Sequence, residues 1–480
     1  MKNIYKLFGA LALIMAIASC EKDFDELNTD PNSPVSVPPE NLVTNVMYGV
    51  SDNYWGRGYN FEFGELMVQH MAQNEYTSDQ NYIFSTSDFD GRWGALYSGS
   101  GGLYDLALAK QMIEANETMP AAQKANQLAV IDIFYSFGFQ MITDLWGDVP
   151  YSQAFQPSEF PFPTYDSQAE IYSNMISKVS AAVGAINTAE NGFVSGDILF
   201  GGDMAAWRDF GNALLLRMGM RISEANASLA QSTVSSALSA SLPSTDIMFL
   251  FSDNQALANP FYRDTEVGAR DDFRISEILA NTMGANNDPR LTFYADPAPG
   301  NTVIIGMPFG LDDAGAFALK NSTSDIHVNI EDNPTSPAYL ISLAEIEFYR
   351  AEAIARGWSA GDAAAAYQAG ITASMNQWGV DAIATASYLA EPGVAYDATS
   401  LATELSSIAT QKWIALYTNG VEAYAEWRRL DLPVLSPGPA AFETTIPTRM
   451  LYPNSEDGRN GESLAAAGAN TLSTTVWWDK

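Results

Sequence analysis

Cysteine and histidine are nearly absent from this chain of 480 residues, which excludes several kinds of catalytic site. Cys20 is the only cysteine, and His70 and His327 are the only histidines. No internal disulfide can form, a Cys–His nucleophile has no spare thiol, and a Ser–His–Asp triad would need one of the two histidines. His70 lies in a helical stretch, where we expect it to pack or to cap. His327 lies in a polar loop, where we expect it to be solvated.

The standard motifs of catalysis and cofactor binding are also missing. The chain contains no H-E-x-x-H, no G-x-S-x-G, no phosphate-binding loop and no complete EF-hand loop. Loop acids such as Asp296, Asp312 and Asp313 do not have the ligand spacing of a calcium site. We therefore expect no cofactor and no metal, and a protein that is not an enzyme. A surface glycan hydrolase stays open as an alternative, because it needs only two carboxylates and this chain has 57 acidic residues.

Basic residues are few, because 24 Lys and Arg stand against 57 Asp and Glu, which gives a net charge of −33. Nucleic acids and bare anionic membranes are also negative, so this charge argues against both as partners. Beyond the N-terminal region, no segment is expected to be long and apolar enough to span a membrane. A hydrophobic content of 47%, with 12% aromatic residues, indicates a folded protein rather than a disordered one.

The N-terminus has the features of a secretory signal. Lys2 and Lys6 precede the apolar run 7–17, which is shorter than the about 20 residues that a membrane-spanning helix needs. The run ends in Ile17-Ala-Ser-Cys20, the pattern of a bacterial lipobox. We expect residues 1–19 to be removed and Cys20 to be acylated, because two or more acyl chains anchor a protein stably. The alternative is an ordinary cleaved signal in which this cysteine has no function.

Residues 20–40 are predicted to form the lipidated cysteine and an extended tether. The segment is polar and contains Pro31, Pro34, Pro38 and Pro39, a composition typical of an extended linker. Its acidic run 21–26 resembles the export tag of surface lipoproteins in Bacteroidetes. We therefore expect a protein that is anchored to the outer membrane by lipid and faces the exterior, with residues 41–480 as the folded domain.

Apolar periodicity over residues 41–480 predicts an all-α, mainly helical domain with few short strands. Steps of three and four residues predict a helix over 128–145, and Asp203 is predicted to cap a second helix that runs to Ile222. A further helix is predicted over 401–416, with a break around Asn419-Gly420 before it resumes.

The clearest predicted helix pair lies between Ser336 and Gly379. Ser336-Pro337 predicts a cap and a first-turn proline, and Gly357 is predicted to end this helix. A second, Ala-rich helix is predicted to begin near Asp362. The pair resembles a tetratricopeptide hairpin, although the chain has no regular 34-residue repeat.

Long stretches rich in Gly, Pro, Asn and Asp separate the predicted helices. They are residues 51–64, 74–92, 147–166, 252–272, 295–334 and 431–475. Loops of this length are uncommon in compact domains unless they are functional, and binding residues often lie on such loops above a rigid scaffold.

Aromatic rings concentrate in three of these regions, 54–63, 74–93 and 259–274. A flat ring can contact the apolar face of a sugar or a peptide side chain, while Asn, Asp and Arg bind hydroxyls or carboxylates. Half or more of these rings are expected only to pin the loops to the helices. The predicted ligand residues are Tyr76, Asp79, Tyr82, Phe84, Trp93, Tyr262, Arg270 and Asp272. If they do not bind ligand, the site is expected at Tyr54, Trp55 and Tyr59.

Six segments, in order, resemble the SusD/RagB family of nutrient-binding outer-membrane lipoproteins. They are Leu145-Trp-Gly-Asp-Val-Pro-Tyr-Ser-Gln-Ala-Phe155, Trp207 through Ser223, Asn287-Asp-Pro-Arg-Leu291, Ala344 through Ala353, Trp413 through Pro433 and Arg449-Met-Leu-Tyr-Pro453. We interpret their charged residues, such as Arg217 and Glu352, as buried ion pairs between helices. Trp146 and Trp427 are expected in the core.

The resemblance implies a tetratricopeptide-like scaffold that binds glycan fragments or peptides outside the cell. It also implies delivery of the ligand to a SusC-like TonB-dependent transporter, over which the protein lies as a lid. The implied site lies in the loop before Trp93 and in the loop before Asn287. Besides a glycan hydrolase, a structural adaptor of the transporter without its own ligand stays open.

Overall fold

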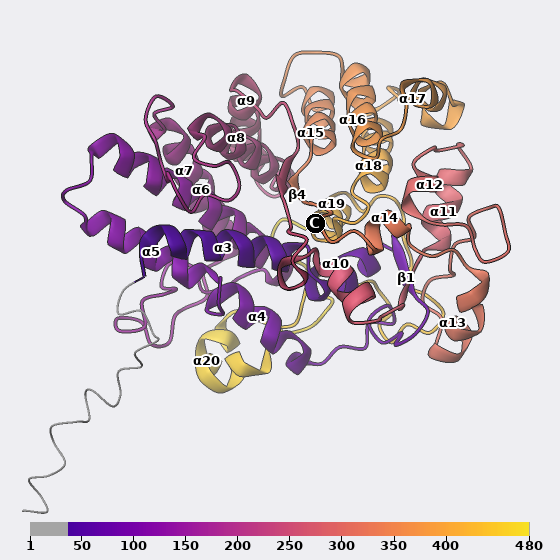
Figure 1. The fold of residues 1–480 in the computed structure, drawn as a ribbon, viewed down its shortest axis with the longest axis horizontal. Coiled ribbons are helices and arrows are strands. Elements are labelled where there is room, and N and C mark those ends of the chain that lie inside the picture. The colour runs from indigo at the N-terminus through magenta and orange to yellow at the C-terminus, as the bar shows by residue number, and fades with distance from the viewer. Residues whose placement is uncertain (1–36, 480) are drawn as a thin grey trace, which may run out of the picture.

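The computed structural model describes residues 37–479, and most regular structure in this range is helical (Figure 1). The described residues form 18 α-helices and four short strands, which confirms the predicted all-α, mainly helical class. Cys20 and residues 21–36 of the predicted tether lie outside the described residues, whereas Pro39 and Glu40 at its end already belong to the first described helix.

Six helices build the N-terminal half, at the left of Figure 1. They are α3 (Pro39–Tyr54), α5 (Leu103–Ala115), α6 (Ala121–Trp146), α7 (Gln168–Ala185), α8 (Met204–Arg221) and α9 (Ala227–Ser239). α5 packs on α3 and α6, and from α6 to α9 each helix packs on the next. Asp203 caps α8 as predicted, because its carboxylate accepts a hydrogen bond of 2.8 Å from the backbone N–H of Ala205.

The longest of these helices is α6, and it differs from the expectation that no segment beyond the N-terminal region could span a membrane. Its length and apolar composition are sufficient to cross a membrane, contrary to the expectation from the sequence. However, 83% of its most apolar window is buried inside the protein. A helix that is apolar on all sides and surrounded by other helices is typical of the core of a large domain, and α6 has that role here.

Four helices build the second half of the scaffold. They are α15 (Leu343–Ala355), α16 (Ala363–Gln377), α18 (Leu401–Ala415) and α19 (Gly420–Leu430). α15 packs on α16 and α18, in the helical-hairpin arrangement that the sequence predicts. Asp362 caps α16, and Asn419 caps α19 at the predicted break between α18 and α19.

The start of α15 differs from the prediction. Ser336 does not cap a helix; residues 338–341 form strand β4 (Ala338–Ile341), which pairs antiparallel with β2 (Ile247–Phe249). Ser342 caps α15 instead and accepts a hydrogen bond from the backbone N–H of Glu345 at 3.2 Å. The pairing with a strand some 90 residues earlier in the chain overrides the local helix signal, because strand formation depends on its partner.

The stretch 51–64 also differs from the loop that its composition predicts. α3 continues to Tyr54, and the π-helix η1 (Arg57–Glu65) follows almost at once. All five aromatic rings of the stretch are at most 4% exposed, so the segment lies in the core and packs on α19. Tyr54, Trp55 and Tyr59 are among these rings, so each exposes at most 4% of its surface to a ligand.

The remaining elements are short and lie around the scaffold. The strands β1 (Met71–Gln73) and β3 (Phe273–Ile275) form a second two-stranded sheet. The further helices are η2 (Thr86–Phe89), α4 (Asp90–Tyr97), η3 (Gln255–Leu257), α10 (Pro260–Tyr262), η4 (Arg263–Val267), α11 (Glu277–Gly284), α12 (Leu291–Tyr294), α13 (Asp313–Leu319), η5 (Lys320–Ser322), α14 (Val328–Glu331), α17 (Ala382–Leu389), η6 (Pro392–Val394) and α20 (Asn454–Ala466).

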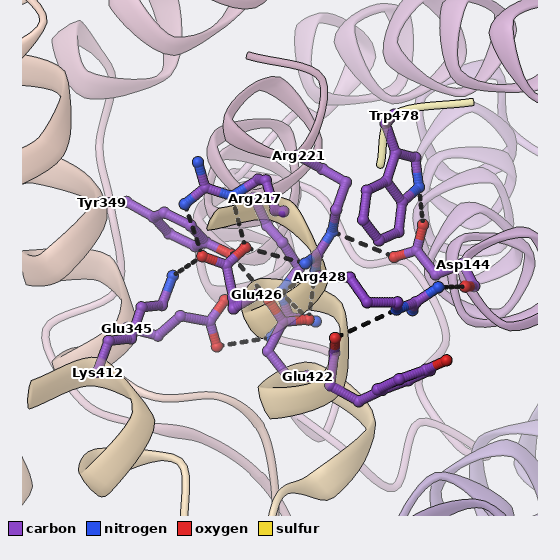
Figure 2. A network of polar contacts seen from close by, with 12 residues as sticks. Asp144, Arg217, Arg221, Glu345, Tyr349, Lys412, Glu422, Glu426, Arg428 and Trp478 are labelled. Carbon is purple, nitrogen blue, oxygen red and sulfur yellow. Dashed lines mark hydrogen bonds and ion pairs between the residues drawn. The ribbon is translucent and has the colours of Figure 1, made fainter. Parts of the chain in front are cut away.

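A network of buried charges joins the two halves of the scaffold (Figure 2). Arg217 on α8 pairs with Glu345 on α15 at 2.6 Å, and Arg221 pairs with Glu422 on α19 at 2.6 Å. Arg429 pairs with Glu352 at 2.6 Å. These contacts confirm the predicted buried ion pairs. Loss of one partner would leave an uncompensated buried charge, which typically costs about 3–5 kcal/mol.

Candidate binding site

The pairing of β1 with β3 brings two of the predicted ligand loops together. Met71 lies opposite Ile275 and Gln73 opposite Phe273, and the backbone N–H of Asn74 donates to the carbonyl of Asp272 at 2.8 Å. The loop that follows β1 therefore begins beside the end of the loop that precedes β3. Residues about 200 positions apart in the chain become neighbours at this edge.

Tyr76 is the most exposed aromatic ring at this edge. Its side chain is 62% exposed, and its backbone has a positive φ of 54°. The guanidinium of Arg270 lies 4.9 Å from the centre of the ring, within the range of a cation–π contact. Arg270 is held in turn by the buried carboxylate of Asp272, at 2.6 Å from its Nε. Tyr76, Arg270 and Asp272 therefore form one cluster, with one face of the ring on the guanidinium.

Arg57 connects this cluster to further charged groups. Its guanidinium donates to Asp272 at 2.8 Å and to Asp264 at 3.0 Å, and its Nε contacts Glu62. Glu62 also accepts a hydrogen bond from Arg92 at 3.1 Å. A hollow of about 360 Å³ lies beside these groups and is lined by Arg57, Arg92 and Asp264, with Arg263 and the backbone around Gly58. Through the contact of Arg57 with Asp272, charged hydrogen-bonding groups of both signs connect the Tyr76 cluster to this hollow.

Asp79 and Phe84 lie on the same loop as Tyr76. The side chain of Gln73 donates to Asp79 at 3.1 Å. Burial raises the pKa of Asp79 to about 6, and the negative charge of Glu62 adds to the rise. Phe84 is half-buried and packs on Phe63 and Phe89, with ring centres 5.6 Å apart in each pair. Asp79 is a candidate for contact with ligand, whereas Phe84 packs on the buried rings and holds the loop to the core.

Three other predicted ligand residues lie elsewhere or are covered. Tyr82 is 0% exposed, so its ring packs inside the protein and is corrected from a ligand residue to a core residue. Trp93 is 6% exposed and stacks on Tyr97 at 4.7 Å; it lines a different hollow and not the Tyr76 cluster. Tyr262 is half-buried on α10, directly before the Arg263–Asp264 segment that borders the hollow of 360 Å³.

Arg57, Glu62 and Asp264, which extend the Tyr76 cluster, were not predicted from the sequence. Arg57 and Glu62 lie in the aromatic stretch 54–63, where the rings were the stronger signal. Those rings are buried, and the charged residues between them face the site. The available signal was the presence of Arg and Glu among apolar residues, since charges in an otherwise buried segment are usually paired or exposed.

The two histidines have structural roles. His70 is fully buried, with its Nδ1 3.2 Å from Glu65 and its ring 5.0 Å from that of Trp413, so the expected packing role is confirmed. The expectation of a solvated His327 is wrong. Its side chain is 16% exposed, accepts a hydrogen bond of 3.0 Å from the backbone N–H of Asn329, and thereby caps α14.

The loop acids bind backbone and side-chain donors. Asp312 caps α13 at Gly315, and Asp313 accepts from both the N–H and the hydroxyl of Thr77. Asp296 accepts from the backbone N–H of Val328 at 2.8 Å. Among residues 37–479, no group of three or more His, Cys, Asp or Glu side chains is arranged to hold a metal ion.

Comparison with known protein families shows to which family the chain belongs. The family model described as starch-binding and associating with the outer membrane matches residues 31–453. This protein belongs to the SusD-like family. The match covers most of the chain, and confirms the resemblance that the six ordered segments indicate.

Solved structures share the fold of this SusD-like protein. A chitin-binding protein is 26% identical with a TM-score of 0.80, over 92% of this chain and 99% of its own. A chitin-binding SusD homologue from Flavobacterium johnsoniae is 24% identical with a TM-score of 0.77, over 91% and 98%. A SusD homologue from Parabacteroides distasonis is 21% identical with a TM-score of 0.80, over 92% and 98%. No curated protein matches the chain.

Proposed function

We propose that this SusD-like protein binds an oligosaccharide at the cluster of Tyr76, Arg270 and Asp272 and performs no chemistry on it. The exposed ring of Tyr76, held on Arg270, carries the proposal. An exposed flat ring fixed by a salt-bridged guanidinium loses little freedom when a sugar stacks on it. Arg57 binds Asp272 of this cluster and also Asp264, so the cluster continues into further charged groups for the hydroxyl groups of the ligand.

The relatives support a glycan rather than a peptide as the ligand. Two of the similar solved structures are chitin-binding proteins, and the family model is described as starch-binding. A peptide remains the second candidate, because the cluster carries charges of both signs that could bind its termini. A hydrolase is less favoured, because it needs two acids that are free to act on the glycosidic bond, whereas Glu62, Asp264 and Asp272 are each paired with Arg57.

The family also supports a place for the protein in nutrient uptake. We infer that Cys20 is acylated, that the lipid holds the protein on the exterior of the outer membrane, and that the bound oligosaccharide passes to a SusC-like TonB-dependent transporter. The family description includes association with the outer membrane, and the lipobox and acidic run precede the folded domain.

Binding is tested by calorimetry with oligomers of N-acetylglucosamine and of glucose, and with a set of short peptides. Tyr76→Ala should weaken the binding of the preferred glycan about tenfold, since a stacking contact contributes about 0.5–1.5 kcal/mol beyond its buried area. Tyr76→Phe should keep most of the affinity. Tyr104→Ala is the matched control, because Tyr104 is an exposed tyrosine on α5.

Four results would contradict this proposal. If peptides bind and no glycan does, the ligand is a peptide and not an oligosaccharide. If neither binds, a structural adaptor of the transporter is favoured. Release of shorter sugars from the glycan during the incubation would favour a hydrolase. An unchanged affinity in Tyr76→Ala would place the glycan at another surface.

A further inference from the structure

A second group of aromatic and cationic residues lies on other elements than the Tyr76 cluster. α5, α6 and α7 enclose a hollow of about 410 Å³, which the turn 151–156 borders. We call it the lysine hollow, because Lys110 and Lys178 both line it. In Figure 1 these helices lie at the left, whereas β1 lies at the right. The lysine hollow is therefore not part of the site already described.

Lys178 is the unusual residue of the lysine hollow. Its ammonium lies 4.5 Å from the ring centre of Tyr135 and 5.1 Å from that of Tyr151, in cation–π range of both. Lys110 pairs with Asp132 at 2.7 Å. Lys178 forms no ion pair within the described part of the chain, although the protein has 57 acidic residues. Asp132 and Glu114 also line the lysine hollow, but Asp132 is paired with Lys110 and neither acid forms an ion pair with Lys178. The Lys178 ammonium is therefore suited to an anionic ligand group.

The rest of the lysine hollow fits a sugar ring. Tyr135, Tyr151 and Phe155 provide aromatic surface, and Gln111, Gln156 and Asn174 provide amide groups. The hydroxyl of Tyr151 donates to the amide oxygen of Asn174 at 2.7 Å, which orients both side chains. Aromatic walls with a few fixed polar groups are the usual lining of a small-ligand site, and typical sites have volumes of about 300–1,000 Å³.

A larger hollow lies next to the lysine hollow and extends it. It measures about 780 Å³ and is lined by Trp93, Tyr97 and four prolines of the segment 150–163. Ala154 and Phe155 border both hollows. Phe155 has a φ of 63°, a left-handed conformation that is unusual for a bulky residue. Its ring also contacts those of Tyr97 and Tyr135, so it is fixed between the two hollows.

We propose that these two hollows form a second binding site for an acidic oligosaccharide, with the carboxylate of one sugar on Lys178. The sugar ring would stack in the lysine hollow, and the neighbouring sugars would lie along Phe155 into the larger hollow. The choice of a sugar as ligand rests on the proposed function. The position of the site and its preference for an anionic group rest only on the two hollows and on Lys178.

The test uses calorimetry with galacturonate trimer and with a hyaluronan tetramer, each compared with its methyl ester. The ester keeps the shape of the sugar and removes the charge. We expect at least one acid to bind at least tenfold more tightly than its ester. Lys178→Met should abolish this difference, because the methionine keeps an apolar stem over the two rings without the charge. Lys178→Arg should retain affinity within about threefold, since it keeps a cation at the position.

Control variants separate this site from the first one. Tyr76→Ala should leave the binding of the acid unchanged, and Lys178→Met should leave the binding of neutral N-acetylglucosamine oligomers unchanged. The proposal is overturned if neither acid binds, if acid and ester bind equally, or if Tyr76→Ala removes acid binding while Lys178→Met does not. Failure of neutral oligomers to bind would affect the proposed function alone, because it is measured with different ligands and a different variant.

Discussion

Tyr76 and Tyr82 lie six residues apart in one loop, and both have a positive φ, yet one ring is 62% exposed and the other 0%. Segments distant in the chain cover the Tyr82 region: the side chain of Asn81 donates to the carbonyl of Leu311, and its own carbonyl accepts from the N–H of Phe442. The composition of the loop predicts a candidate site, and the structure brings Tyr76, Arg270 and Asp272 together. The composition of the loop does not predict which of the two rings is covered, because the covering residues come from other loops.

Asp79 should make the stability of the protein depend on pH. Its pKa is about 6 in the folded protein, above the ordinary value of 3.8, mainly because the group is buried. Between these two values the folded state holds a proton that the unfolded state releases, so stability falls as the pH rises from about 4 to about 6. Asp79→Asn should therefore raise the free energy of unfolding at pH 7.5 by about 1–3 kcal/mol.

The gain should disappear near pH 4, where Asp79 is protonated in the folded state. Chemical denaturation of the wild type and Asp79→Asn at several pH values measures this directly. Asp253→Asn is a suitable control, since Asp253 is an exposed acid in a loop. A gain that is equal at pH 4 and pH 7.5 would contradict a titration of Asp79 and would indicate a difference in packing.

At the level of single elements, the sequence predicts helices well where their own residues determine them. Asp203, Asp362 and Asn419 cap helices at the predicted positions. Ser336 has the same local signal, but its segment pairs with β2, and Ser342 becomes the cap instead. The difference arises because a cap needs only the neighbouring backbone, whereas a strand needs a partner that the local sequence does not contain.

The π-helix η1 depends on a close contact with α19. A Cβ atom placed on Gly64 would lie 2.2 Å from the carbonyl carbon of Gly420, and both backbones are buried. Gly64→Ala should therefore separate η1 from α19 and lower the free energy of unfolding by at least about 1–3 kcal/mol. A thermal melt with parallel chemical denaturation measures the loss.

Gly184→Ala is the matched control for this change. Gly184 lies near the end of α7 and is exposed, and a methyl group added at its Cα would meet no atom within 4 Å. Alanine there should be neutral or should stabilise the helix by about 0.5–1 kcal/mol. If Gly64→Ala were as stable as Gly184→Ala, the contact between η1 and Gly420 would not be as close as described.

At the scale of the whole molecule, the order of the family segments predicts the helical scaffold but not how its charges connect. Arg217 and Arg221 lie four residues apart on α8 and both contact Glu422 on α19. Arg217 also pairs with Glu345 on α15, and Arg221 with Asp144 on α6. Helical spacing places the two arginines on one face. Glu345 and Glu422 lie more than 120 residues further along the chain and Asp144 lies on an earlier helix, so only the packed structure assigns these partners.

The attachment of the whole molecule to the membrane is predicted to depend on Cys20. The chain carries a net charge of −33, so the folded domain is not expected to be held by anionic lipids, whereas two or more acyl chains hold a protein stably. Cys20→Ala should abolish incorporation of labelled fatty acid and remove the protein from the outer-membrane fraction after a high-salt wash. The affinity of the purified domain for a glycan should stay unchanged, because the proposed site lies within residues 57–272, far from Cys20 in the chain. Glu21→Gln changes the next residue and should retain both the label and the outer-membrane location. Retention of Cys20→Ala in the washed outer membrane would show that something other than the lipid holds the protein there.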